Sequence, residues 1–163
     1  QLIGYILFTH HDFAEKEFPR LERLLAEAVR EGSGHPDLLE MKEQFRHFRE
    51  FFSGHMREEE KYFFPFFLML SADSGTPPLS GESMERLVRI MESEHREVDG
   101  ALSRIREKTR GYHIPLEAGP RLRQLMEGLK FLEAELQRHA RVETRVLFPK
   151  VTALEARRQK SKN

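Results

Sequence analysis

The sequence predicts an all-α protein, folded as an up-and-down antiparallel four-helix bundle. Apolar residues recur at helical spacing along four long segments, and short breaks rich in Gly, Pro and Ser separate these segments. No segment shows the period-2 alternation of a half-buried strand. A chain of 163 residues has the usual size of one domain. We therefore expect a single domain over residues 1–154, followed by a basic tail, residues 155–163, that frays in solvent.

The first two segments form one helix pair. The first ends at the break "EGSGHP", and its inward-facing stripe comprises Ile3, Ile6, Leu7, Phe18, Leu21, Leu24, Leu25 and Ala28. The second begins after Pro36 and continues through Leu70. It contains Pro65, which lacks a backbone N–H, so we expect a kink or a local break there.

The last two segments form a second pair. Ser83 precedes a Glu-rich turn and is the expected N-cap of the third helix. The fourth helix is expected to run from about Leu116 into the basic tail, with a second kink at Pro149. The apolar stripes comprise Leu87, Val88, Ile90, Met91, Val98, Leu102 and Ile105 in the third helix, and Leu122, Leu125, Leu129, Leu132, Leu136 and Val146 in the fourth.

The composition argues against several classes of partner and site. Lys and Arg together number 27, as do Asp and Glu, so we expect no binding to nucleic acid or to an anionic membrane. The chain has no Cys, which excludes disulfides, zinc–thiolate sites and thiol catalysis within it. This composition suits a reducing compartment, and we expect a cytoplasmic location. The longest apolar run, "YFFPFFLML", is shorter than the ~18 residues of a membrane span.

The histidines follow a repeat. His11 and His55 are 44 residues apart, and His95 and His139 are also 44 residues apart. The second member of each pair opens a similar stretch, "HMREEEKYFFPFF" and "HARVETRVLFPKV", with a Glu four residues on and a Phe-Pro further along. These regularities predict two helix pairs related by a pseudo-twofold axis.

This spacing suits metal binding. On a helix, residues i and i+4 lie on one face, so His55 with Glu59, and His139 with Glu143, aim an imidazole and a carboxylate at one point. Together with one His from each remaining helix, they supply four nitrogens and two carboxylates inside the bundle. Two bridging carboxylates with terminal imidazoles suit two neighbouring iron or manganese ions. Zinc is less apt, since its sites are usually tetrahedral and mononuclear.

A purely structural role is the alternative to a metal site. A lone His-x-x-x-Glu on a helix is commonly an exposed hydrogen-bonded pair. Phenylalanines crowd the sequence after His55, however, and Leu136, Val142 and Val146 flank His139, so exposure fits poorly. Burial of four imidazoles and two carboxylates without metal would cost several kcal/mol per unpaired charge. The sequence therefore favours metal ligation.

The first helix offers two adjacent histidines. Counted at 100° per residue, His10 lies closer to the centre of the apolar stripe. The apolar residues around His11 nevertheless match those around His95, and His11 restores the 44-residue symmetry. We select His11 as the ligand and keep His10 as an additional candidate. Tyr62, one turn beyond Glu59, is a candidate hydrogen-bond donor to the site.

The motifs resemble a known family. "THHDFAEKEFPRL", "HMREEEKYFFPFF", "MESEHREVDG" and "HARVETRVLFP" occur in this order across nearly the whole chain. They resemble the hemerythrin-like, His-His-Glu cation-binding domains, and most closely the RIC (repair of iron centres) proteins. The resemblance implies a non-haem di-iron centre held by one His from each of four helices and two bridging glutamates. The implied ligands are His11, His55, Glu59, His95, His139 and Glu143.

The sequence departs from the oxygen-carrying members of this family. Asp99 stands where they have an additional His, and the last motif ends in Glu143 rather than Asp. These differences argue against a dedicated oxygen carrier. They also make Asp99 a candidate further ligand, beside water, an oxo group or an incoming diatomic molecule.

Three functions fit this interpretation. The resemblance implies a stress-response di-iron protein that helps restore iron–sulfur or di-iron centres after nitric oxide or oxidant damage. It would donate iron to apo iron–sulfur client proteins or handle nitric oxide at its own site. The alternatives are a sensor of dioxygen, nitric oxide or iron that signals to a partner, and a redox enzyme acting on nitric oxide or peroxide. No catalytic residue is assigned, and enzyme activity is left open.

Overall fold

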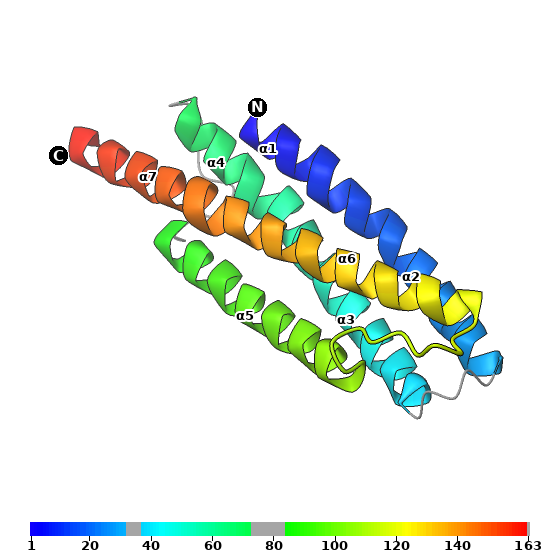
Figure 1. Cartoon of the computed structure of the whole chain (residues 1–163). Helices are drawn as coiled ribbons and strands as arrows, with labels where there is room; N and C mark the ends of the chain where they lie inside the picture. The colour runs from blue at the N-terminus through cyan, green and yellow to red at the C-terminus, as the bar shows by residue number, and fades with distance from the viewer. Residues whose placement is uncertain (32–36, 73–83, 163) are drawn as a thin grey trace.

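The computed structural model describes residues 1–31, 37–72 and 84–162, with side chains as far as residue 160, and all regular secondary structure within these ranges is helical. Four long rods lie alongside one another and alternate in direction (Figure 1). The predicted all-α, up-and-down four-helix bundle is confirmed. Ser83, the expected N-cap of the third helix, lies outside the described residues.

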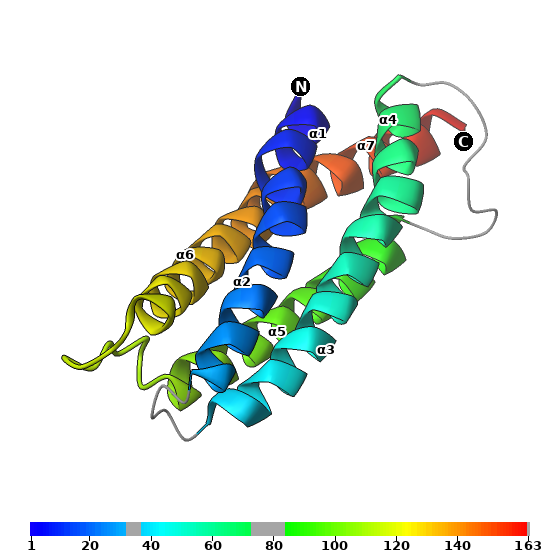
Figure 2. The same cartoon turned by 90° about the vertical axis from the view of Figure 1, so that its right-hand side faces the viewer.

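Three of the four rods combine α-helix with a π-helical turn, labelled η. The rods are, in chain order, α1 (Leu2–Tyr5), η1 (Ile6–His11) and α2 (Asp12–Arg30); α3 (Leu38–Glu58), η2 (Glu59–Phe63) and α4 (Phe64–Ser71); α5 (Met84–Lys108); and α6 (Pro120–Val142), η3 (Glu143–Leu147) and α7 (Phe148–Lys162). Both α2 and α5 pack against α3 and α6, which closes the bundle, and both termini lie at the same end (Figures 1 and 2). The basic tail that was expected to fray continues α7 to Lys162.

Two of the π-turns end two residues before a proline. Pro65 and Pro149 are the second residues of α4 and α7. A proline offers no N–H to the carbonyl four residues back, so a regular α-helix would leave one carbonyl unpaired at each point. The chain responds with one wider turn, η2 or η3, and then resumes the α-helix. The local break expected at each proline is therefore a π-turn.

The π-turns change which side chains face the core. A π-turn inserts one extra residue, which rotates every later side chain relative to the 3.6-residue period. The prediction that Val146 lies on the inner stripe is wrong, since Val146 is 38% exposed and Leu147 is fully buried. Ile90, also placed on a stripe, is 39% exposed because it falls outside the three-and-four spacing of its buried neighbours. Leu116 is exposed and precedes α6, which begins at Pro120.

The core has two apolar clusters with a polar layer between them. The larger contains Phe18, Phe45, Phe52, Leu102 and Leu132 among its members. The smaller lies toward the termini and contains Ile6, Phe63, Phe64, Met91, Leu147 and Phe148 among its members. The layer between them holds the buried histidines and glutamates of the repeat. No helix in the described part of the chain is both long and apolar enough to cross a membrane.

Candidate metal centre

Six side chains converge in the polar layer, and all four rods contribute. They are the residues predicted from the spacing: His11, His55, Glu59, His95, His139 and Glu143. All are buried, and both glutamates are fully inaccessible to solvent. The structure brings them together as two overlapping groups of four, and within each group one ligand atom per residue lies within 4.8 Å of the others.

The two glutamates belong to both groups. The first group contains His11 and His139, and the second contains His55 and His95. Glu59 turns its Oε2 toward His11 Nε2 at 3.2 Å and its Oε1 toward His55 Nε2 at 3.4 Å.

Glu143 likewise turns one carboxylate oxygen toward a histidine of each group. Its Oε1 lies 2.9 Å from His139 Nε2, and its Oε2 lies 3.0 Å from His95 Nε2. Each carboxylate therefore offers one oxygen to each histidine pair.

The polar atoms at the centre lack hydrogen-bond partners among the described residues. These atoms are the Nε2 of all four histidines and both oxygens of both glutamates. They are close together, yet their orientation does not satisfy hydrogen-bond geometry. Buried polar atoms are normally paired. A cluster of unpaired nitrogen and oxygen atoms that lie this close together is therefore the arrangement expected of metal ligands.

Two further glutamates hold the outer nitrogens of two histidines. His11 Nδ1 lies 2.7 Å from Glu60 Oε1, and His55 Nδ1 lies 2.6 Å from Glu94 Oε2. A carboxylate at this position fixes the tautomer that leaves Nε2 free for a metal, and raises its basicity. Sequence reasoning missed both residues, because a Glu beside a ligand looks like part of a solvated, charged helix face.

The charges inside the cluster depend on one another. Burial lowers the pKa of His55, but Glu59 and Glu94 outweigh burial and raise that pKa to about 9. Burial alone would raise the pKa of Glu143, yet His139 holds it well below the usual range. Burial and the charge of Glu143 raise the pKa of Glu59. The metal-free cluster therefore carries protons on its ligands, and these must leave when a metal binds.

His10 is buried beside the cluster but belongs to neither group of four. Its ring lies nearly parallel to that of His139, with centroids 5.5 Å apart. Neither ring nitrogen has a hydrogen-bond partner among the described residues. Burial, together with the neighbouring His139, lowers the pKa of His10 to about 4, so the His10 ring is neutral near pH 7. Both His10 and His11 lie in η1, and both are buried.

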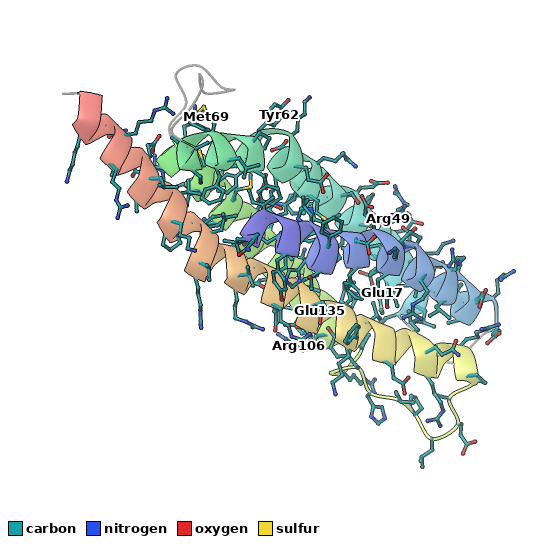
Figure 3. The ribbon with its side chains drawn as sticks, turned by 90° about the horizontal axis from the view of Figure 1, so that it is seen from above. Glu17, Arg49, Tyr62, Met69, Arg106 and Glu135 are labelled. Carbon is teal, nitrogen blue, oxygen red and sulfur yellow. The ribbon has the colours of Figure 1, made fainter. Side chains whose placement is uncertain are left out.

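The remaining candidates lie outside the buried cluster. Asp99 is exposed and lines a groove that also reaches His95. Tyr62 is half-buried, and its ring lies under the Lys61 ammonium at 4.9 Å (Figure 3 shows it at the outer edge of the ribbon). Neither residue belongs to the two groups of four that the structure brings together among the described residues.

Comparison with known proteins identifies the family. The model of the hemerythrin HHE cation-binding domain matches residues 3–151. The chain belongs to this family. The hemerythrin fold and the buried His/Glu cluster together assign a cation-binding role to the centre of the bundle.

Relatives with assigned names are similar to this chain in sequence at moderate identity. The chain is 29% identical over 153 residues to the iron–sulfur cluster repair protein ScdA of Staphylococcus haemolyticus, covering 91% of this chain and 65% of that protein. It is 26% identical over 155 residues to ScdA of Staphylococcus epidermidis, covering 93% of this chain and 66% of the relative. It is also 26% identical over 154 residues to the iron–sulfur cluster repair protein YtfE of Escherichia coli, with 94% and 66% covered. The chain thus spans slightly under two thirds of the length of these relatives.

Proposed function

We propose that the cluster holds two iron ions bridged by Glu59 and Glu143. One ion is bound by His11 and His139, and the other by His55 and His95. The observation that carries this proposal is the division of the two carboxylates, each of which offers one oxygen to each histidine pair.

The donor set supports iron over zinc. Four imidazoles and two shared carboxylates suit a pair of neighbouring iron ions in a helical bundle, whereas structural zinc prefers a closed tetrahedral site for one ion. The same nitrogen and oxygen donors also accept manganese. The proposed metal-binding domain comprises residues 1–154, which contain all six ligands.

The proposed role is the restoration of damaged iron centres during nitrosative or oxidative stress. The relatives are named as iron–sulfur cluster repair proteins, and their similarity covers nearly the whole of this chain. The protein would donate iron to apo iron–sulfur clients, or handle nitric oxide at its own centre. Such clients, together with a chain without Cys, suit a reducing compartment, so the proposal places the protein in the cytoplasm.

The chain's own residues prepare the centre for this role. Iron, when bound, supplies one-electron chemistry and affinity for diatomic ligands. Glu60 and Glu94 orient two of the four imidazoles. The rings of Phe64 and Phe148 lie against His11 and His95, each at 5.7 Å between centroids, and exclude water from that side. His95 has no hydrogen-bond partner at Nδ1 among the described residues, so it is held less firmly than His11 or His55.

Transfer of iron to a client tests the proposed role. Iron-loaded protein is mixed with an apo iron–sulfur protein, sulfide and a reductant, and cluster formation is followed by absorbance with a ferrous chelator present. The chelator captures free iron, so cluster formation well above that with an equal amount of ferrous salt would support direct donation. Cluster formation no better than with the salt would contradict it. Sustained consumption of nitric oxide with a reductant would instead favour the enzyme alternative.

A further inference from the structure

A groove between α5 and α6 reaches the metal centre from the side. Its volume is about 640 Å³, and its lining includes His95, Asp99, Ala140, Arg141, Thr144 and Arg145. The side chain of His95 is 10% exposed, whereas those of His11, His55 and His139 are 3% exposed or less. Among the ligands, His95 is therefore the one that a molecule in this groove approaches.

The pseudo-twofold axis gives this groove a counterpart. His11 and His95 are 84 positions apart, as are Glu59 and Glu143. A second groove, between α2 and α3, is lined by Glu15, Ser53, Met56, Arg57 and Glu60 among others, and 84 positions later these are Asp99, Gln137, Ala140, Arg141 and Thr144 of the first groove. The second groove has a volume of about 360 Å³, and His11 is not part of its lining.

Two substitutions between the halves account for this difference. In the α2–α3 groove the buried Met56 fills the space near the ligands, and Glu60 reaches inward to hold His11. The equivalent positions in the α5–α6 groove hold Ala140 and Thr144, whose side chains are smaller. The shorter side chains leave the approach to His95 open.

The groove between α5 and α6 carries positive charge that no ion pair in the described part of the chain neutralises. Within the described part of the chain, neither Arg141 nor Arg145 has an ion-pair partner, and both are exposed on one face of the rod. Arg106, which also lines the groove, is already paired with Glu133. Asp99 is the one lining carboxylate in the described chain without such a partner. Two free guanidinium groups against one free carboxylate leave the groove with a net attraction for anions.

We propose that the α5–α6 groove is the entrance through which a small monovalent anion reaches the metal centre, with Arg141 and Arg145 recruiting it and His95 at its inner end. The inference rests on the proposed iron centre. The ligand is small because the residues that would hold the ions are buried, so only a small molecule would reach them past Ala140 and Thr144. The groove adds an exogenous-ligand site on one side of the bundle, beside one of the two histidine pairs.

Azide is a suitable probe, since it is a small monovalent anion whose binding to ferric iron changes the absorption spectrum. The rate of azide binding is measured by stopped-flow absorbance on iron-loaded protein at fixed ionic strength. The doubly substituted A140M/T144Q chain fills the groove with neutral side chains, as Met56 fills its counterpart. R141Q/R145Q removes two positive charges from the groove, and Lys130→Gln, which removes one charge elsewhere on α6, is the control for loss of charge outside the groove. Iron content is determined for every protein.

The proposal predicts that azide binds about tenfold more slowly to R141Q/R145Q, and more slowly still to A140M/T144Q, with K130Q like the wild type. It also predicts that higher ionic strength slows azide binding to the wild type but slightly speeds it in R141Q/R145Q, where Asp99 is the free charge that remains in the groove. Equal azide rates in all iron-loaded variants would overturn the groove assignment while leaving the iron centre intact. A wild-type protein that takes up no iron would instead contradict the proposed function, and this inference with it.

Discussion

His11 and His55 each have a carboxylate at the outer ring nitrogen, whereas His95 has none among the described residues. The difference follows from single positions in the repeat. Glu60 corresponds to Thr144, 84 positions later, and His10 corresponds to Glu94. Each histidine pair therefore combines one imidazole fixed by a carboxylate with one that is not. This division predicts unequal contributions of the four histidines to metal retention.

Glu94→Gln is expected to weaken iron binding about tenfold, because it replaces a charge-assisted hydrogen bond to His55 with a neutral one. The measurement is the rate at which a ferrous chelator removes iron from the protein. Glu97→Gln, an exposed change on the same helix, serves as the control. If the two variants release iron equally fast, Glu94 does not position His55.

The choice between the two adjacent histidines has its own test. His11→Ala is expected to lose roughly half of the bound iron, since one of the two metal positions would keep a single imidazole. His10→Leu is expected to retain its iron, because the ring it removes has no hydrogen-bond partner in the described structure. Iron analysis of the two purified proteins decides. Loss of iron from the His10 variant with retention in the His11 variant would reverse the assignment.

At the scale of the helices, sequence periodicity predicted the elements but not their rotation. Every expected helix is present, and the buried positions of α2, α3, α5 and α6 follow the 3.6-residue period. A fixed angle per residue cannot anticipate a π-turn, so Val146 was placed inward instead of Leu147. The same angle favoured His10 over His11, whereas η1 buries both. Pro65 and Pro149 marked two of the places where the period fails, without indicating that a wider turn would result, and no proline marks η1.

The close approach of α2 and α6 depends on Gly128. A Cβ atom added there would lie 2.5 Å from Leu21 Cδ2 and 2.6 Å from Arg20 Nη2. Gly128→Ala is therefore expected to lower the free energy of unfolding by about 1–3 kcal/mol through overpacking.

Gly100→Ala is the control for this prediction, since the nearest atom to an added Cβ is a flexible Arg104 nitrogen at 3.5 Å. It is expected to raise the free energy of unfolding by roughly 0.5–1 kcal/mol, as Ala favours the helix over Gly. Urea denaturation measures both. Equal effects of the two substitutions would show that the α2–α6 contact is looser than described.

At the scale of the whole molecule, the polar layer divides two apolar clusters and must be neutralised for the bundle to be stable. The equal 44-residue spacings of the histidines and the two His-x-x-x-Glu motifs predicted the six residues that converge in this layer, because residues i and i+4 share one face of a helix. The outer partners Glu60 and Glu94 could not be found in this way, since the repeat does not conserve them between halves. The open groove could not be predicted from the sequence either, because it depends on where the small side chains of Ala140 and Thr144 lie in the folded bundle.

Metal removal is expected to destabilise the entire fold. Without metal, the buried carboxylates and imidazoles lose their shared counter-charge, and the binding free energy that favoured the folded state is lost. We expect the melting temperature to fall by about 10 °C after treatment with a chelator and to recover on reloading with iron. Circular dichroism at rising temperature measures this. A melting temperature that does not respond to either treatment would show that the layer is stable without metal.

The central claim is that two carboxylates bridge two iron ions. The most direct measurement is the metal content per chain, with an absorption spectrum, of protein purified aerobically without a chelator. The account predicts two irons per chain and the near-ultraviolet charge-transfer bands of ferric iron. A single zinc per chain, or a protein that takes up no iron even after incubation with ferrous salt, would contradict it.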